Sequence, residues 1–337
     1  MDKIVLITGA SRGIGAATAL LAARQGWAVA VNYQGNQAAA DAVVQRIRDG
    51  GGTALAVQAD VADEAQVLAM FAAVDAQLGR ITALVNNAGV VDRTQRVDEM
   101  SVARLRRMFD INVIGSFVCA REAVRRMSIS PLNPRNRRCV RFWQGRNLGA
   151  GRSRVVHPAS TATTSAALPE PHPAGRGCGG RAAALPALQR HPALAAPGAL
   201  PRTRRSPGAP PISRVQRTGH GGAGGSIVNV SSAAARLGAA GQYVDYAAAK
   251  GAIDVLTLGL AREVGAEGIR VNAVRPGLIE TDIHASGGLP DRVRDLAHLV
   301  PMQRGGTAEE VAEAIVWLMS DASPYTTMSL LEVSGGR

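Results

Sequence analysis

A short strand, a glycine-rich turn and a helix follow one another near the N-terminus, and this order restricts the folds open to the chain. Residues 4–7 are branched and apolar, as in a buried parallel strand. The turn contains Gly9, Gly13 and Gly15, and residues 16–25 form a helical pattern closed by Gly26. Glycines let the backbone approach a phosphate, and a helix N-terminus directs free N–H groups at it. The pattern predicts a phosphate-binding turn; the alternative is an ordinary tight turn.

Strand and helix patterns alternate along most of the remaining chain. The expected strands are residues 27–33, 53–58, 83–85, 226–230, 269–274 and 330–333, and the expected helices are residues 36–49, 63–78, 102–127, 251–264 and 307–319. Such alternation implies a parallel sheet with helices on both faces. We therefore predict an α/β protein with a doubly wound parallel sheet of about seven strands.

Four of these strands are followed by residues suited to binding a ligand. Gly9, Asp60, Asn87 and Ser232 each stand at the carboxyl end of an expected strand. Ligands of open parallel sheets bind beyond the carboxyl ends of the strands. These residues are therefore expected to meet in one cleft.

Tyr246 and Lys250 are spaced to share one face of a helix. The lysine cation favours the tyrosinate and should lower the pKa of the phenol from its usual value of about 10. A tyrosine of this kind can donate and accept protons in catalysis. Most such pairs are a half-buried tyrosine beside a solvated lysine. Here the glycine turn, the serines Ser231 and Ser232, and the Asn-Asn-Ala-Gly turn at residues 86–89 favour the catalytic interpretation.

The motifs together resemble the short-chain dehydrogenase/reductase family. They are, in order, Thr8-Gly9-x-x-x-Gly13-x-Gly15, Asp60-Val61, Asn86-Asn87-Ala88-Gly89, Asn112, Ser231-Ser232, Tyr246-x-x-x-Lys250 and Arg275-Pro276-Gly277. Within the family the chain is most similar to the 3-oxoacyl-carrier-protein reductase and glucose 1-dehydrogenase types. The resemblance covers residues 1–128 and 219–337 and implies one NAD(P)-binding, Rossmann-like catalytic domain.

The resemblance also implies an NAD(P)-dependent oxidoreductase that transfers hydride between nicotinamide and a carbonyl or secondary alcohol. Tyr246 would exchange a proton with the substrate oxygen, and Lys250 would hold the nicotinamide ribose. Ser232 would bind the substrate oxygen; we prefer it to Ser231 because it lies 14 residues before Tyr246. Asn112 would connect Lys250 to solvent through water.

The residues expected to bind the cofactor come from both halves of the chain. The resemblance assigns this role to Gly9, Ser11, Arg12, Gly13, Ile14, Gly15, Asn32, Asp60, Val61, Asn87, Ala88, Gly89, Tyr246, Lys250, Pro276, Gly277, Ile279 and Thr281. Residues 31–34, at the end of the second strand, include no carboxylate that would repel a 2′-phosphate. Arg12 can bind such a phosphate, unless it is only a solvated turn residue. NADP is therefore favoured over NAD, and no metal site is predicted.

The sequence indicates where the substrate binds without identifying it. Tyr243 and a covering segment at residues 281–301 are expected to shape the pocket, which could admit acyl, sugar or ketone substrates. His284 and His298 are expected on the surface of that segment, not as acid-base groups. Met328 stands where the family commonly has glycine, so a positive φ there would be strained.

Residues 129–218 differ from the rest of the chain. They contain 15 Arg, no Lys, one acidic residue and 13 of the 17 prolines. Their net charge is +14, whereas the net charge of the whole chain is +12, so the other residues together carry −2. No period of a helix or strand persists there, so a low-complexity, disordered basic insert is predicted. A stretch of inserted or non-coding DNA carried into the translation would give this composition. A functional segment is the alternative.

The basic insert raises a second class of function. An impaired enzyme whose insert disrupts assembly or binds nucleic acid non-specifically is the alternative. Phe142 and Trp143 are its only aromatic residues and no zinc-ligand spacing is present, so no specific nucleic-acid partner is predicted. The expected partners are a small-molecule substrate and, from the resemblance, further copies of the chain in a dimer or tetramer.

The sequence also bears on the cellular location. Three cysteines, an odd number, fit a reducing compartment. No apolar run reaches the length of about 18 residues that marks a membrane span, and no signal peptide is evident. A cytoplasmic protein without membrane contact is therefore expected.

Overall fold

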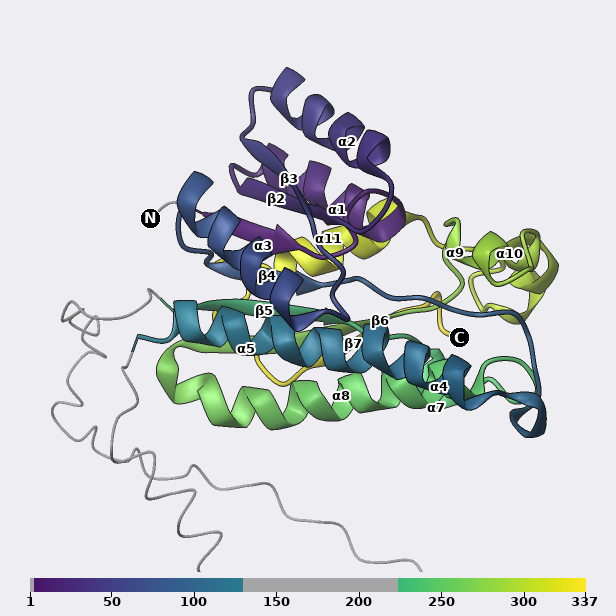
Figure 1. Cartoon of the computed structure of the whole chain (residues 1–337). Coiled ribbons are helices and arrows are strands. Elements are labelled where there is room, and N and C mark those ends of the chain that lie inside the picture. The colour runs from purple at the N-terminus through teal and green to yellow at the C-terminus, as the bar shows by residue number, and fades with distance from the viewer. Residues whose placement is uncertain (1–2, 130–223) are drawn as a thin grey trace, which may run out of the picture. The chain divides into compact units, whose positions relative to one another are not determined.

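The computed structural model describes residues 3–129 and 224–337, which form a three-layer α/β arrangement around one parallel sheet (Figure 1). The strand order is β3-β2-β1-β4-β5-β6-β7, and every neighbouring pair is parallel. The strands are β1 (Ile4–Ile7), β2 (Ala28–Tyr33), β3 (Ala54–Gln58), β4 (Ala83–Asn86), β5 (Gly225–Val230), β6 (Ile269–Pro276) and β7 (Leu330–Val333). The predicted seven-stranded, doubly wound sheet is confirmed.

Helices cover both faces of the sheet (Figure 1). The first face packs against α1 (Gly13–Arg24), α2 (Gln37–Asp49) and α11 (Ala308–Met319), and the second against α3 (Glu64–Gln77), α5 (Gly115–Met127) and α8 (Val244–Val264). Ile315 is fully buried in the first apolar layer and Phe71 in the second. Burial of these two layers is the main force that holds the helices on the sheet.

Several helices begin at residues whose side chains accept hydrogen bonds from the first turn. Asn36 caps α2, and Asp63 caps α3 by accepting from two main-chain N–H groups. Thr307 and Glu310 form a capping box at the start of α11, as the sequence predicts. These bonds satisfy N–H groups that have no partner within the helix, and they set the observed boundaries.

The single helix expected at residues 102–127 is interrupted in the structure. It consists of α4 (Val102–Phe109), a π-helical turn η2 (Asp110–Ile114) and α5. A π turn accommodates extra residues and changes the direction in which the side chains point, and such turns are frequent at functional sites. Asn112, one of the predicted site residues, lies in this turn.

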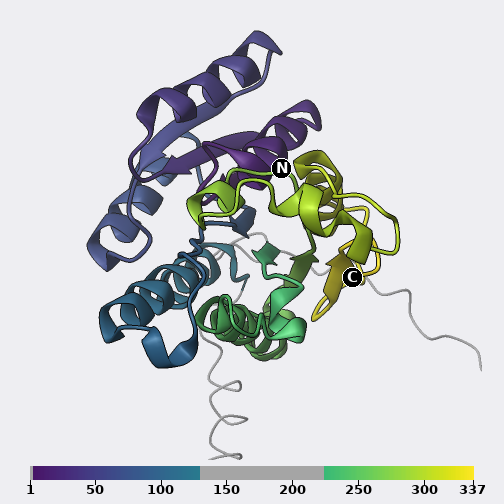
Figure 2. The same ribbon diagram turned by 90° about the vertical axis from the view of Figure 1, so that its right-hand side faces the viewer.

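Shorter elements connect the main layers. They are η1 (Val97–Glu99), α7 (Ala234–Leu237), η3 (Gly265–Glu267), α9 (Ile283–Ser286), α10 (Arg292–Leu296) and η4 (Ala297–Leu299). Figure 2 views the molecule from the side at which α9 and α10 lie, beyond the carboxyl ends of the strands. This is the edge at which parallel sheets bind ligands.

The two ends of the described chain that flank residues 130–223 lie close together and are held by main-chain hydrogen bonds. The Gly224 N–H donates to the Met127 carbonyl over 3.0 Å, and the Ile129 N–H donates to the Glu267 carbonyl over 3.3 Å. β4 and β5 pair directly, with Leu84 opposite Ile227. The segment therefore joins the fold at the amino end of β5, at the edge opposite the ligand-binding one.

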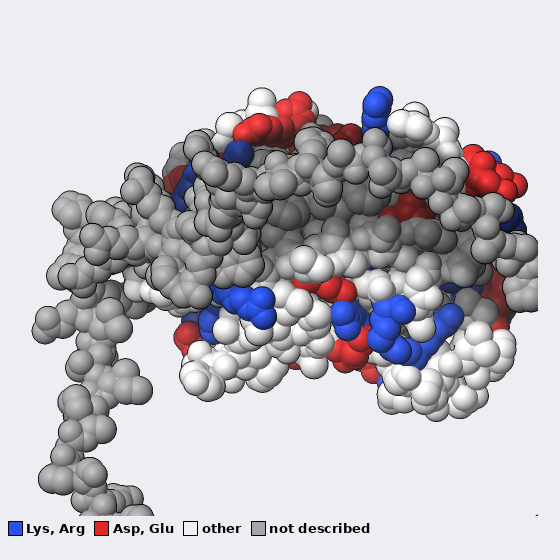
Figure 3. All heavy atoms as spheres, turned by 90° about the horizontal axis from the view of Figure 1, so that it is seen from below, with Lys and Arg blue, Asp and Glu red and all other residues white. Residues whose placement is uncertain are grey.

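The predictions for the basic insert, including its disorder and its contacts with nucleic acid, lie outside the described residues apart from Ile129. The described surface carries charges of both signs. Seen from below the view of Figure 1, Lys and Arg side chains lie beside Asp and Glu side chains on its visible part (Figure 3).

Met328 adopts a left-handed backbone conformation with φ of 64°. Its N–H donates to the Val271 carbonyl over 2.7 Å, which ties the loop before β7 to β6. The strain predicted from the sequence is therefore present, because a side chain at positive φ crowds the backbone.

Candidate active site

Two adjoining cavities lie at the carboxyl edge of the sheet. One, of about 420 Å³, surrounds Tyr246, and the other, of about 440 Å³, surrounds the glycine-rich turn. They share the lining residues Ile14, Asn87, Gly89, Thr281 and Ile283. Together they form one elongated site, as the strand-end argument predicts.

The structure brings most of the predicted site residues to these cavities. The Tyr246 cavity is lined by Ile14, Asn87, Gly89, Ser232, Tyr246, Lys250, Pro276, Gly277, Ile279 and Thr281. The glycine-turn cavity is lined by Gly9, Ser11, Arg12, Gly13, Ile14, Asn32, Asp60, Val61, Asn87, Ala88, Gly89 and Thr281. Gly15 and Asn112 line neither cavity.

The geometry of the glycine turn fits a pyrophosphate. Gly9 and Gly13 have φ values of 61° and 55°, which L-residues with side chains rarely adopt. Arg12 precedes α1 without a side-chain cap, so no side chain blocks the first N–H groups of that helix. A Cβ on Gly15 would lie 2.6 Å from the Gly9 carbonyl oxygen, so Gly15 serves close packing and not direct ligand contact.

Thr8 and Asn87 hold the glycine turn against the turn that follows β4. The Asn87 amide nitrogen donates to the carbonyls of Thr8 and Gly9 over 2.8 and 2.9 Å. The Thr8 hydroxyl accepts from the N–H groups of Asn87 and Ala88, both over 3.0 Å. Thr8 belongs to the glycine-rich sequence motif, but its role is visible only in the fold, which brings residue 8 beside residue 87.

Asn32 stands at the end of β2, but its buried side chain is occupied by protein partners. Its Oδ1 accepts from the Gly9 N–H over 3.1 Å, and its Nδ2 donates to the Ala59 carbonyl over 3.1 Å. Asn32 therefore positions the turn. Beside it, Gln34 donates to Asp60 over 3.0 Å.

Arg12 is exposed at the glycine-turn cavity. None of the ion pairs between described residues includes it. Its guanidinium is therefore available to a ligand anion at this cavity.

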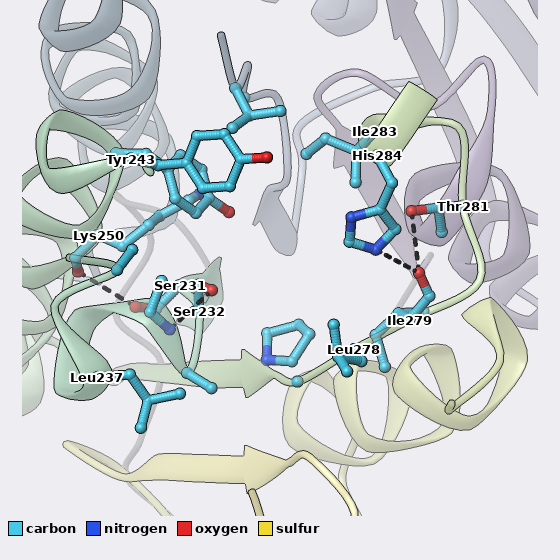
Figure 4. Close-up of a pocket in the computed structure, with 18 of the residues that line it drawn as sticks. Ser231, Ser232, Leu237, Tyr243, Lys250, Leu278, Ile279, Thr281, Ile283 and His284 are labelled. Carbon is cyan, nitrogen blue, oxygen red and sulfur yellow. Dashed lines mark hydrogen bonds between the residues drawn. The ribbon is translucent and has the colours of Figure 1, made fainter. Parts of the chain in front are cut away.

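Tyr246, Lys250 and Ser232 line the other cavity together, and Figure 4 shows Lys250 and Ser232 on the same side of it. The Lys250 Nζ lies 5.5 Å from the centre of the Tyr246 ring and donates to the Val230 carbonyl over 2.7 Å. The Ser232 hydroxyl forms a hydrogen bond with Tyr246 and also accepts from the Ala234 N–H over 3.1 Å. Ser231 instead donates to the Lys250 carbonyl, which fixes α8 to β5.

The pKa of Tyr246 is shifted upward, which is the direction opposite to the one predicted from the sequence. Removal from water raises the pKa of Tyr246 to about 12, and the hydrogen bond with Ser232 only partly opposes this effect. Burial also lowers the pKa of Lys250 to about 8, with the negative charge of Asp254 opposing it. The predicted lowering of the Tyr246 pKa is wrong for this structure, because desolvation of the phenol is the largest effect on it.

Asn112 positions the loop after β4. Its Oδ1 accepts from the Val90 N–H over 3.1 Å, and its Nδ2 donates to the carbonyls of Val90 and Met108 over 3.1 and 3.0 Å. A Cβ on Gly89 would lie 2.6 Å from this Oδ1 and 3.4 Å from the Lys250 Nζ. Asn112, Gly89 and Lys250 are thus packed together, and the expected link through water stays a prediction.

Tyr243 and His284 form opposite walls of the Tyr246 cavity (Figure 4). The role of Tyr243 in shaping this pocket is therefore as expected. His284 was expected on the surface, but α9 turns it inward and its Nε2 lies 3.0 Å from the Ile279 carbonyl oxygen. Burial lowers its pKa, so the ring is neutral near neutral pH.

Three arginines near the site are not singled out by any sequence motif. Arg292 and Arg337 line the Tyr246 cavity, and Arg104 forms a buried ion pair with Asp245. No motif marks these residues, because each is far in sequence from the groups that it approaches.

No helix among the described residues combines the length and apolar character needed to cross a membrane.

Comparison with known proteins agrees with this geometry. Residues 3–133 match the family model described as short chain dehydrogenase, and residues 212–337 match the one described as enoyl-(acyl carrier protein) reductase. The chain is 41% identical to the uncharacterized oxidoreductase YgfF of Escherichia coli, covering 99% of both chains. It is 31% identical to a cis-4-hydroxycyclohexanecarboxylate dehydrogenase of Sinomonas cyclohexanicum, over 99% of this chain and 96% of that protein.

A further relative and a solved structure extend the likeness. The chain is 29% identical to the 3-oxoacyl-[acyl-carrier-protein] reductase FabG of Staphylococcus aureus, over 100% of this chain and 98% of that protein. A short-chain dehydrogenase/reductase of Serratia marcescens has a TM-score of 0.67 and 25% identity, with coverage of 99% and 97%. The family resemblance inferred from the motifs is thus confirmed, and this chain belongs to the short-chain dehydrogenase/reductase family of oxidoreductases.

Proposed function

We propose that the protein is an NADP-preferring oxidoreductase that interconverts a carbonyl compound and a secondary alcohol, with Tyr246 as the acid-base group. The observation that carries this proposal is the meeting of Tyr246, Ser232 and Lys250 in one cavity that adjoins the glycine-turn cavity. The relative from Sinomonas is named for a hydroxy substrate and the one from Staphylococcus for an oxo substrate, which supports this reaction type.

The cofactor would lie across the two cavities. Gly9, Gly13 and the start of α1 would hold the pyrophosphate, and Lys250 would hold the nicotinamide ribose. Bound NADP would supply or accept the hydride. Arg12 would pair with the 2′-phosphate, and the absence of a carboxylate on Asn32, Tyr33 and Gln34 supports NADP over NAD.

The protein residues would handle the proton and the developing charge. The neutral Tyr246 hydroxyl is the proton donor for reduction, and its raised pKa keeps it protonated. The Ser232 hydroxyl would stabilise charge that develops on the substrate oxygen. In the oxidative direction Tyr246 must accept a proton, so a nearby cation is needed to make the tyrosinate accessible. Lys250 is suited to this role.

We also infer that the protein assembles into a homo-oligomer through α5 and α8. Ile114, Phe117 and Val255 expose 50, 48 and 69% of their surface on or beside these helices. Exposed apolar side chains of this size favour contact with another protein surface. We further propose that the oligomer is a tetramer and that the protein is cytoplasmic.

Substitution of Tyr246 tests the proposed function. With a panel of ketones, oxo acids and acetoacetyl thioesters, Tyr246→Phe should lower turnover by about 10²–10⁴-fold while leaving NADPH binding close to wild type. Lys250→Ala should weaken both turnover and cofactor binding. Tyr325→Phe, at an exposed tyrosine, is the matched control. Retention of more than about a tenth of the activity by Tyr246→Phe would exclude its assigned role.

A further inference from the structure

The side chains that line the Tyr246 cavity have an unbalanced charge. Its described lining residues include the cations Lys250, Arg292 and Arg337, and they include no Asp or Glu. We propose that the substrate carries an oxyanion, a carboxylate or a phosphate, which the guanidinium groups of Arg292 and Arg337 bind. This inference rests on the proposed function, because it names the substrate class of the same cavity.

Lys250 does not provide the anion site. Its ammonium group is buried, donates to the Val230 carbonyl over 2.7 Å and packs beside Gly89 at the base of the cavity. It lies one helical turn from Tyr246 and is committed to the reaction centre. The positive charge that remains for the substrate therefore belongs to the two arginines.

Arg292 is held in place by neutral groups. It begins α10, within the covering segment, and its Nη2 donates to the Gln242 Oε1 over 2.7 Å. Its guanidinium carbon lies 5.2 Å from the centre of the Tyr243 ring. These two contacts orient the cation without neutralising it, and no ion pair between described residues includes Arg292. The adjacent Asp291 pairs with Arg294 instead, over 2.9 Å.

Arg337 lies close enough to Arg292 for the two charges to repel. Burial, and then the charge of Arg292, lower the pKa of Arg337. Its Nη1 is shielded from solvent and has no hydrogen-bond partner among the described residues. The main-chain oxygen of Arg337 accepts from Arg236 Nη2 over 2.8 Å, which anchors this end of the chain. Two partly desolvated guanidinium groups in such proximity are costly unless an anion lies between them.

Apolar side chains form a large part of the remaining lining of the cavity, beside polar groups such as Ser232 and His284. Leu237, Leu278 and Ile283 line it together with the Tyr243 ring (Figure 4). A substrate with an apolar body and one anionic end therefore fits the apolar side chains and the two arginines together. Guanidinium groups bind carboxylate and phosphate oxygens with similar geometry, so both sources of the oxyanion are retained.

Matched substrate pairs test the proposal. The probes are 2-oxobutanoate, acetoacetate and 4-oxopentanoate, each beside its methyl ester, and hydroxyacetone phosphate beside hydroxyacetone. At least one charged member should exceed its neutral partner in kcat/KM by about tenfold or more. The pair that shows the preference distinguishes carboxylate from phosphate. Neutral partners that equal or exceed every charged member would overturn the inference while leaving the proposed function intact.

Variants assign the preference to the two arginines. Arg292→Gln and Arg337→Gln should each reduce kcat/KM for the preferred anion by about tenfold, mainly through KM, with the neutral partner little changed. Arg294→Gln, on the same helix and solvent-exposed, is the control and should retain the preference. A parallel loss for charged and neutral partners would show a structural role and contradict the proposal.

A binding measurement separates the two proposals. Calorimetric titration of the Tyr246→Phe protein with each charged and neutral probe reports binding without turnover. If Tyr246→Phe binds a charged probe and the Arg292→Gln/Tyr246→Phe double variant does not, the inference is supported. This holds even if the wild-type protein turns over none of the probes. Such a lack of turnover would count against the proposed function alone. Failure of all the charged probes to bind overturns the inference.

Discussion

Arg104 and Asp245 form a buried ion pair that joins α4 to α8, with the Nε of Arg104 2.8 Å from the Oδ2 of Asp245. The Oδ1 of Asp245 accepts the Tyr246 N–H over 2.9 Å. Arg104 also donates to the Arg93 carbonyl and to Gln95, so it links three segments. The first turn of the helix that carries Tyr246 is therefore fixed by a residue 141 positions earlier in the chain.

Neutralising this pair should impair both stability and turnover. Asp245→Asn leaves the Arg104 cation buried beside a neutral amide, so the free energy of unfolding should fall by about 3 kcal/mol. We expect kcat to fall more than KM rises, because the variant displaces Tyr246 without removing it. Denaturant titration and steady-state kinetics measure these effects.

A double variant provides the control for this ion pair. Arg104→Met/Asp245→Leu should recover much of the stability, since no buried charge remains, but little of the turnover. Full recovery of turnover would mean that the pair does not position Tyr246.

The ionisation of Tyr246 should be visible in the ultraviolet spectrum. Because burial raises the pKa of Tyr246 from 10.0 to about 12, the tyrosinate absorbance lost in Tyr246→Phe should appear only well above pH 10. A stopped-flow pH jump records it before the protein unfolds. A difference signal centred near or below pH 10 would contradict the desolvation argument.

The same shift determines a dependence of stability on pH. A raised pKa means that the folded state holds the proton more tightly than the unfolded chain. The contribution of Tyr246 is therefore constant below about pH 10 and is lost as the pH rises through about 12. Tyr246→Phe should reduce the loss of stability in that window.

Arg12 should control the choice between cofactors. Arg12→Gln is expected to raise the KM for NADPH by about tenfold or more and to leave the KM for NADH nearly unchanged. The substitution removes the guanidinium partner of the 2′-phosphate, a group that NADH lacks. Arg24→Gln, at the exposed far end of α1, is the matched control. Equal effects on both cofactors would show that Arg12 contacts the shared part of the dinucleotide.

Relief of strain at Met328 should stabilise the protein. Met328→Gly places glycine at a φ of 64°, and the free energy of unfolding should rise by roughly 0.5–1 kcal/mol. Met302→Gly, at an exposed methionine outside the positive-φ positions, should instead destabilise it. Thermal or denaturant unfolding distinguishes the two, and destabilisation by both variants would contradict the strain argument.

Removal of residues 130–223 should leave the catalytic domain folded. The Gly224 N–H already bonds to the Met127 carbonyl, so Ile129 and Gly224 can be joined by a short linker, and loop closure costs little. We expect the cofactor affinity to match that of the full chain. A deletion variant that does not fold would show that the segment contributes to the domain.

The sequence alone determined the fold and the side-by-side placement of Tyr246 and Lys250, because these signals are local. Branched apolar runs mark β1 to β7, glycines mark the turns that need positive φ, and the spacing of Tyr246 and Lys250 corresponds to one helical turn. Each of these features depends only on neighbouring residues. Most of the predicted site residues therefore line the two cavities.

Only the tertiary structure decided which groups meet across the sheet and how they are solvated. The π turn at Asn112, the inward position of His284, and the placement of Arg292 and Arg337 in one cavity all depend on contacts between distant segments. The direction of the Tyr246 pKa shift also depends on the tertiary structure, because desolvation depends on everything packed around the phenol. A local pattern fixes which side chains are neighbours on one element, whereas burial and charge balance are properties of the assembled fold.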